Sequence, residues 1–226
     1  ISGVFLPKVT AMVTRDGNER EISDLFIRTG RIQYIVMSFI LSAFVVFGRP
    51  FIRLWAGEGY EEAYFITLLF FFALLIPLIQ NLGVIILQAR NQMRFRSVCY
   101  VVIALCCLAF SIYSAQRWGM MGCAYATAGA LLLGQGLVMN IYYRDRQGID
   151  IFRFWREIGR MSVVPLLLVA LSLLIVDYWE INLAKPVAFA YSAAVFTVLY
   201  VPLFWFVSMN AYERDLFTSP LRKIRK

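Results

Sequence analysis

Several amide side chains that could bind a polar ligand lie inside apolar stretches of this chain. Gln80 and Asn81 follow Pro77 in one stretch, and Gln135 and Asn140 lie in another. Amides donate and accept hydrogen bonds without a net charge, and they are costly against lipid. We therefore expect them either to bond a neighbouring helix or to line a cavity that holds a polar ligand.

The residue types that most enzymes and metal sites require are absent or badly placed. His does not occur, and no Asp, Glu, Lys or Arg lies at the middle of an apolar stretch. The four cysteines lie inside apolar stretches without metal-ligand spacing, so we expect small core residues: Cys99, Cys106, Cys107 and Cys123. With no nucleophile beside a base and no Gly-rich phosphate loop, we predict no catalytic residue, metal or cofactor.

The elements that carry these side chains belong in a bilayer. The 226 residues are 61% hydrophobic and only 16% charged, which is more apolar surface than a soluble domain of this size buries. The net charge of +8 could indicate nucleic-acid binding, but Lys and Arg gather at the ends of the apolar stretches. That placement is typical of membrane proteins, so we expect no nucleic-acid partner.

Six apolar stretches are long enough to cross a membrane as helices. They cover residues 32–47, 63–88, 98–115, 120–143, 161–176 and 186–209. The connections on one side hold 18 of the 22 Lys and Arg residues, whereas the other side holds four. Because cytoplasmic loops are enriched in Lys and Arg, the pattern predicts an all-α multi-pass membrane protein with about six transmembrane helices and both termini in the cytoplasm.

Two of the cytoplasmic segments are amphipathic. Residues 17–34 place Ile22 and Phe26 on one helical face, and residues 149–160 offer Phe154 and Trp155 to lipid beside basic side chains. We expect two short interfacial helices here. They could serve as elbows that set the direction of the next span or as lipid-specific sites.

Prolines and glycines predict bends in two spans. Pro77 removes a helical hydrogen bond near the middle of the second span, and Gly83 follows within two turns. Pro202 does the same in the last span.

The fourth span carries a stripe of small residues. Gly or Ala recurs at every fourth position, so one face of this helix is nearly bare of side chains and another backbone can approach it closely. These residues are Gly122, Ala126, Ala130 and Gly134. We predict a helix-packing face.

Three stretches of this sequence resemble one transporter family. FLPKVTAMVTRDGNEREISDLFIRTGRIQY is similar to a helix end followed by a polar loop, and QARNQMRFRS with WGMMGCAYATA is similar to the entry into two successive spans. FGRPFIRLWAGEGYEEA resembles an external loop of the family through Pro50, Trp55, Gly57 and Tyr60. The family is the polysaccharide or lipid-linked oligosaccharide flippases of the MOP exporter superfamily, related to multidrug and toxin extrusion transporters and lipid II flippases.

The resemblance implies a function and a place in a larger protein. The chain would be the carboxy-terminal half of a bacterial cytoplasmic-membrane flippase, with residues 1–143 in the core lobe and 144–226 forming a basic elbow, two final spans and a basic tail. Its first residue, Ile1, is not Met, and we expect a fragment whose amino-terminal lobe is missing.

The expected partners are that lobe, membrane lipids and an undecaprenyl-linked oligosaccharide moved by alternating access. The pyrophosphate of such a substrate would meet cations, for which Arg28 and Arg31 are candidates, although both could be ordinary cytoplasmic anchors. The alternatives are a multidrug or metabolite antiporter of the same superfamily, a non-transporting membrane subunit and a membrane glycosyltransferase.

Overall fold

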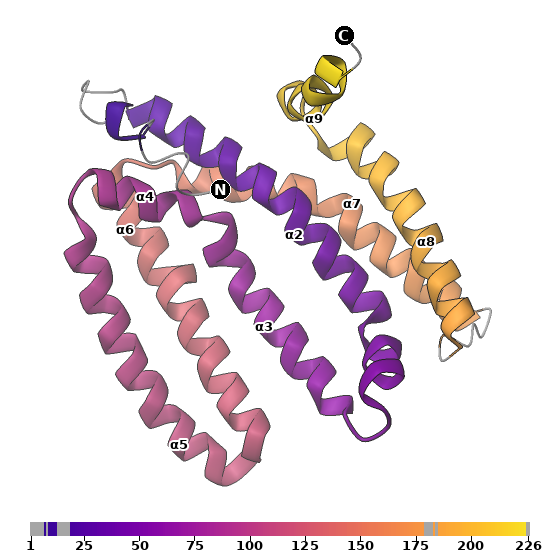
Figure 1. The fold of residues 1–226 in the computed structure, drawn as a ribbon. Coiled ribbons are helices and arrows are strands. Elements are labelled where there is room, and N and C mark those ends of the chain that lie inside the picture. Colours follow the sequence, from indigo (N-terminus) through magenta and orange to yellow (C-terminus); the bar gives the residue numbers. More distant parts are fainter. Residues whose placement is uncertain (1–6, 8, 13–18, 179–182, 184, 225–226) are drawn as a thin grey trace. The chain divides into compact units, whose positions relative to one another are not determined.

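The computed structural model describes residues 7, 9–12, 19–178, 183 and 185–224, and all regular elements within them are helical (Figure 1). Apart from residues 7 and 9–12, the helix end expected around Pro7 lies outside this set, as do residues 225–226 of the basic tail. The elements are α2 (Glu19–Ala56), α3 (Glu61–Ile79), α4 (Asn81–Ala89), α5 (Met93–Leu131), η1 (Leu132–Val138), α6 (Met139–Gln147), α7 (Ile151–Tyr178), α8 (Pro186–Leu203), η2 (Phe204–Ser208) and α9 (Ala211–Ile224).

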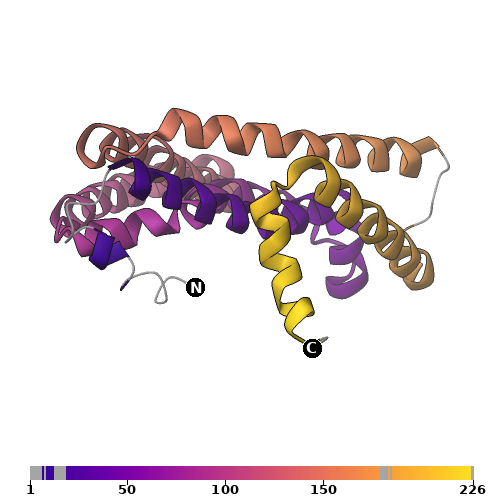
Figure 2. The same cartoon turned by 90° about the horizontal axis from the view of Figure 1, so that it is seen from above.

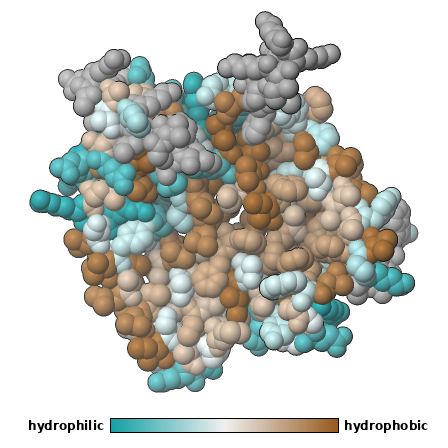
Figure 3. Space-filling view, viewed as in Figure 1, coloured by the Kyte–Doolittle hydropathy of each residue, from teal (hydrophilic) through white to brown (hydrophobic). Residues whose placement is uncertain are grey.

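Five continuous helical stretches in the described residues are long and apolar enough to cross a membrane. They are Glu19–Ala56, Glu61–Ala89, Met93–Gln147, Ile151–Tyr178 and Pro186–Ser208. Figure 3 shows hydrophobic side chains along the face of α5, with hydrophilic side chains at its two ends. The prediction of an all-α multi-pass membrane protein is confirmed, while the cytoplasmic placement of both termini stays a prediction.

The third stretch, Met93–Gln147, folds back on itself at Gly119. That residue has φ 55° and ψ −135°, a conformation that a side chain would oppose. Residues on either side of Gly119 pair in antiparallel order: a Cβ at Gly122 would meet the Ser114 carbonyl oxygen, and one at Gly134 would lie 2.8 Å from Ile103 Cδ1. The predicted spans 98–115 and 120–143 are therefore the two arms of one hairpin (Figure 1).

The tight packing of Gly134 in this hairpin gives a first prediction. Gly134→Leu should lower the free energy of unfolding by about 1 kcal/mol, because the new side chain must displace the tip of Ile103. Unfolding in mixed detergent micelles measures the change. Gly129→Leu is the matched control, since a Cβ at Gly129 meets no atom within 4 Å; equal losses in both variants would contradict the packing role.

The two expected interfacial helices are not separate elements. Residues 19–34 are the first turns of α2, and residues 151–160 are the first turns of α7, each continuous with the span that follows. No proline lies between the amphipathic part and the apolar part of either helix, so nothing forces a break. Part of their apolar faces packs on protein: Phe26 and Phe154 are fully buried, with ring centroids 5.1 Å apart, whereas Phe152 is 65% exposed.

The expected external loop is mostly helical. The helix α2 continues through Pro50 and Trp55 to Ala56, because a membrane-spanning helix tolerates an internal proline when its neighbours remain bonded. The actual turn is short and is made by Gly57 and Gly59, with φ of 90° and 99°. Trp55 and Tyr60 are exposed on either side of it.

The last span ends in a π-helical turn near the predicted bend. Pro202 lies one residue before the end of α8, and η2 follows directly. Met209 is then extended, with φ −83° and ψ 136°, so the chain turns and α9 leaves at a steep angle to α8 (Figure 2). The backbone N–H of Asn210 donates to Glu213 at 2.9 Å and thereby helps to cap the start of α9, which the sequence analysis did not anticipate.

The chain forms two compact units, each made of two chain segments. The first unit comprises Ile1–Tyr34 with Phe65–Arg156, and the second comprises Ile35–Tyr64 with Glu157–Lys226. Aromatic contacts fill the second unit, where Tyr200 donates from its hydroxyl to Ser38 at 3.1 Å and Phe47 packs against Phe196 with centroids 5.6 Å apart. The predicted division of the chain after residue 143 stays a prediction.

Candidate functional site

The candidate site lies in the first unit, where α3 breaks before α4. Pro77 has no N–H, so the carbonyl of Ala73 loses its helical donor. The helix nevertheless continues to Ile79 and breaks at Gln80, which has φ −102° and ψ 14°. The bend predicted at Pro77 is therefore located three residues later, where the new helix starts with a bond from Gly83 N–H to the Gln80 carbonyl at 2.9 Å.

A side chain of α2 covers the end of α3. With the Gln33 amide assigned from its hydrogen-bond surroundings, its nitrogen donates to the carbonyls of Leu78 at 2.8 Å and Ile79 at 3.2 Å. These carbonyls lie at the helix end, where intrahelical donors run out. The break is thus held in place by a polar contact with α2, which suits a backbone irregularity inside a membrane protein.

A second irregular helical turn lies close to the break between α3 and α4. Residues 132–138 form the π-helical turn η1, and the N–H of Met139 reaches back to the carbonyl of Gly134. The wider turn leaves carbonyls available, and the Asn140 amide nitrogen donates to two of them, Gln135 at 3.2 Å and Gly136 at 2.6 Å. Asn140 therefore fastens this turn from within the helix.

The same Asn140 side chain joins the two irregularities. Its Oδ1 accepts from Gln80 Nε2 at 2.7 Å and from the indole N–H of Trp155 at 3.3 Å. Gln80 is 1% exposed and Asn140 8% exposed, so α3, α6 and α7 meet at a buried polar hub. Oε1 of Gln80 is buried and has no hydrogen-bond partner among the described residues.

Next to the hub, a tyrosine ring occupies the space that a side chain at Gly83 would need. A Cβ at Gly83 would lie 2.5 Å from Cζ of Tyr143, whose side chain is 1% exposed. The Tyr143 hydroxyl accepts from Arg96 at 3.3 Å, and the same guanidinium donates to Tyr100 at 3.0 Å. The absence of a side chain at Gly83 therefore lets α4 contact the ring of α6.

A third polar group holds the turn between α4 and α5. Arg90 donates to both the backbone carbonyl and the side-chain oxygen of Gln147, at 3.2 and 3.1 Å. Gln147 is fully buried and donates in turn to Oε1 of Gln92. The α4–α5 turn is thus tied to the end of α6.

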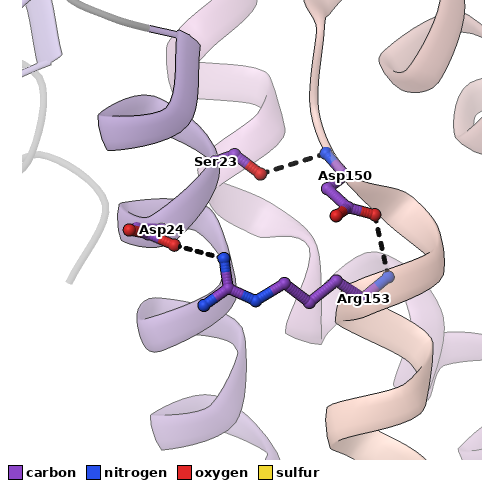
Figure 4. A network of polar contacts seen from close by, with 4 residues as sticks. All are labelled: Ser23, Asp24, Asp150 and Arg153. Atoms are coloured by element: carbon purple, nitrogen blue, oxygen red, sulfur yellow. Dashed lines mark hydrogen bonds and ion pairs between the residues drawn. The ribbon is translucent and has the colours of Figure 1, made fainter.

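The start of α7 is fixed to α2 by the contacts drawn in Figure 4. The Asp150 carboxylate accepts from the backbone N–H of Arg153 at 2.9 Å and so caps the helix. The backbone N–H of Asp150 donates to the Ser23 hydroxyl at 3.0 Å. The Arg153 guanidinium forms an ion pair with Asp24 at 2.7 Å. These contacts position Trp155 one turn further along α7.

The predicted site residues fall into three groups. Gln80 and Gln135 come together through Asn140, Gln80 by its side chain and Gln135 by its carbonyl. Asn81 is half-buried, Arg28 is exposed and Arg31 is buried at 4% exposure. The remaining predicted positions in the second unit are not part of this site: Pro50, Trp55, Gly57, Tyr60 and Pro202.

Sequence reasoning missed the central role of Asn140 and assigned Trp155 to lipid. The Trp155 correction has a physical reason, since a half-buried indole N–H needs an acceptor and finds Oδ1 of Asn140. Asp150 carried a usable signal, because an Asp directly before an apolar helical run is a typical N-cap. Within the described residues, no group of three His, Cys, Asp or Glu side chains could hold a metal ion.

No protein-family model, no curated protein and no solved structure matches this chain. The resemblance to flippases therefore rests on the sequence stretches quoted above.

Proposed function

We propose that this chain is part of a transporter that moves a lipid-linked oligosaccharide across the bacterial cytoplasmic membrane by alternating access. The observation that carries the proposal is the buried amide hub, in which Gln80 and Asn140 join two interrupted helices at 2.7 Å. Transporters use interrupted helices of this kind to build binding sites and to let parts of a bundle move. The sequence resemblance supplies the substrate class.

The hub is compatible with helix motion because its hydrogen bonds can be exchanged for others. Oε1 of Gln80 is buried and bonds to none of the residues that the structure describes, so this amide can gain a hydrogen bond in another arrangement of the same helices. The break between α3 and α4 leaves one backbone position, Gln80, outside the helical geometry. A small change at that position redirects the whole of α3 or α4, which is how hinges absorb domain motion.

Cations near the start of α2 fit a pyrophosphate-bearing substrate. Arg31 is 4% exposed in a chain whose spans are otherwise nearly free of charge, and Arg28 lies one turn earlier with its side chain exposed. A charge inside a membrane protein is costly and generally marks a functional path. In the proposal the exposed Arg28 attracts the anionic headgroup, and the buried Arg31 binds it at the next step along its path.

A leaflet-resolved flipping assay tests the proposal. The complete protein that contains this chain is placed in vesicles with a fluorescent undecaprenyl-pyrophosphate oligosaccharide, and a membrane-impermeant quencher reports the exposed leaflet. We expect protein-dependent exchange of this lipid and none of a fluorescent phosphatidylcholine. We expect Arg28→Gln with Arg31→Gln to slow exchange by roughly tenfold, whereas Arg117→Gln, on the predicted opposite side, should leave it unchanged.

Two results would overturn the proposal. One is exchange no faster than in protein-free vesicles while the protein remains folded. The other is proton- or sodium-driven efflux of a cationic dye without any movement of the oligosaccharide lipid, which would instead establish the antiporter alternative.

A further inference from the structure

A groove of about 850 Å³ opens on the first unit beside the α4–α5 turn, and its lining residues do not include Gln80, Asn140 or Trp155 of the buried hub. Its walls come from the start of α5 and from the end of the hairpin's returning arm, and its lining includes Arg94, Phe95, Val138, Ile141 and Arg146. These residues belong to the side of the membrane that the distribution of Lys and Arg assigns to the cytoplasm.

One end of the groove is cationic. Arg94 and Arg146 are both exposed, and neither makes a hydrogen bond or ion pair with another residue in the described part of the chain. Asp145 also lines the groove, but its carboxylate lies 3.9 Å from the guanidinium of Arg144. The start of α5 adds the positive end of a helix dipole to the same place.

The rest of the groove is apolar and exposed. Phe95 stacks on Tyr142 with centroids 4.0 Å apart, and Ile141 is 52% exposed. The apolar surface continues along the same face of α5 into exposed side chains, such as Val98 at 63% and Val102 at 52% exposure. A ligand that fills the groove therefore meets charge at one end and hydrocarbon along its length.

The groove is built on a fixed turn. Asn91 adopts φ 54°, and Gln92 N–H bonds back to the Leu87 carbonyl at 2.8 Å, as in a Schellman helix end. The contact between Gln92 and Gln147 then ties this turn to α6. Arg94 and Arg146 are thus held on elements that are joined to one another.

We propose that this groove binds one anionic phospholipid of the surrounding membrane, with its phosphate between Arg94 and Arg146 and an acyl chain along Phe95, Val138 and Ile141. Two arginines complement a phosphodiester, and the adjoining apolar surface offers an acyl chain a contact that a small soluble phosphate cannot make. The lipid would fasten the open end of the hairpin to the membrane surface. This inference holds whether or not the protein flips oligosaccharide lipids.

Native mass spectrometry of the delipidated chain in detergent tests it. Phosphatidylglycerol is titrated against phosphatidylcholine with the same acyl chains, and the dissociation constant of the first bound lipid is measured. We expect phosphatidylglycerol to bind preferentially and Arg94→Gln with Arg146→Gln to weaken it roughly 30-fold. The matched control is Arg156→Gln with Arg160→Gln, which removes the same charge from exposed positions of α7 and should leave the affinity unchanged.

Two further measurements separate lipid from phosphate and binding from folding. Soluble glycerol phosphate should not displace the bound lipid, and Ile141→Gln should weaken phosphatidylglycerol while both arginines remain. Arg94→Lys with Arg146→Lys keeps the charge and should retain the preference even if the Gln pair fails to fold. Equal affinity for both phospholipids, equal loss in the α7 control, or displacement by glycerol phosphate would each overturn the proposal.

Discussion

Asn140→Leu is expected to lower the free energy of unfolding by about 3 kcal/mol. The substitution removes two bonds to Oδ1, from Gln80 and Trp155, and two bonds from Nδ2 to the carbonyls of the π-helical turn. Each buried group left without a partner costs roughly 1 to 3 kcal/mol, and rearrangement inside the membrane recovers part of that cost. Unfolding in mixed detergent micelles, followed by circular dichroism, measures the loss.

The asymmetry of the hub supplies the controls. Gln80→Met removes one bond and also the unpartnered Oε1, so its cost should be below about 1 kcal/mol. Gln80→Met combined with Asn140→Leu should cost less than the two single losses together, because the Gln80 amide is no longer left unpaired. Asn81→Leu changes a half-buried neighbour outside the hub and should be nearly neutral. A loss for Asn140→Leu no greater than that for Asn81→Leu would show that the hub contributes nothing.

The membrane class and the helix content were predictable because they depend on local hydropathy. A run of apolar residues must become helical in a bilayer whatever its neighbours are. The reversal at Gly119 falls between two predicted spans for the same reason, since Arg117 interrupts the apolar run there. Local signals of this kind require no knowledge of which helix packs against which.

The hub was not predictable because it depends on distant partners. Gln80 and Asn140 are 60 residues apart, and nothing in either local sequence indicates the other. The same limit explains why Phe154 was assigned to lipid, since an amphipathic face can be covered either by a membrane or by another helix. Only the presence of Phe26 opposite it decides between the two.

The position of the helix break shows a different limit. Proline indicates that one hydrogen bond is lost but not where the backbone relaxes. Around Pro77 the relaxation occurs at Gln80, where Gln33 supplies donors to the helix end and Asn140 supplies an acceptor. Tertiary hydrogen bonds therefore choose the site of the bend.

Gly83→Ala separates a packing role from a hinge role at the predicted bend of the second span. The added methyl group would lie 2.5 Å from Cζ of a buried Tyr143 ring, so we expect a loss of about 2 kcal/mol in the free energy of unfolding. Glycine needed only for flexibility would give the opposite result, because alanine favours a helix by roughly 1 kcal/mol. Gly159→Ala is the control, since a Cβ there meets nothing within 4 Å.

A double-mutant cycle completes this test. Tyr143→Leu alone should destabilise the protein by about 2 kcal/mol through the cavity it leaves and the lost bond from Arg96. In the double variant the alanine methyl group occupies part of that cavity, so the combined loss should fall short of the sum by at least about 1 kcal/mol. Strict additivity would mean that the two side chains do not compete for space, and Gly83 would then have to act through backbone flexibility at the start of α4.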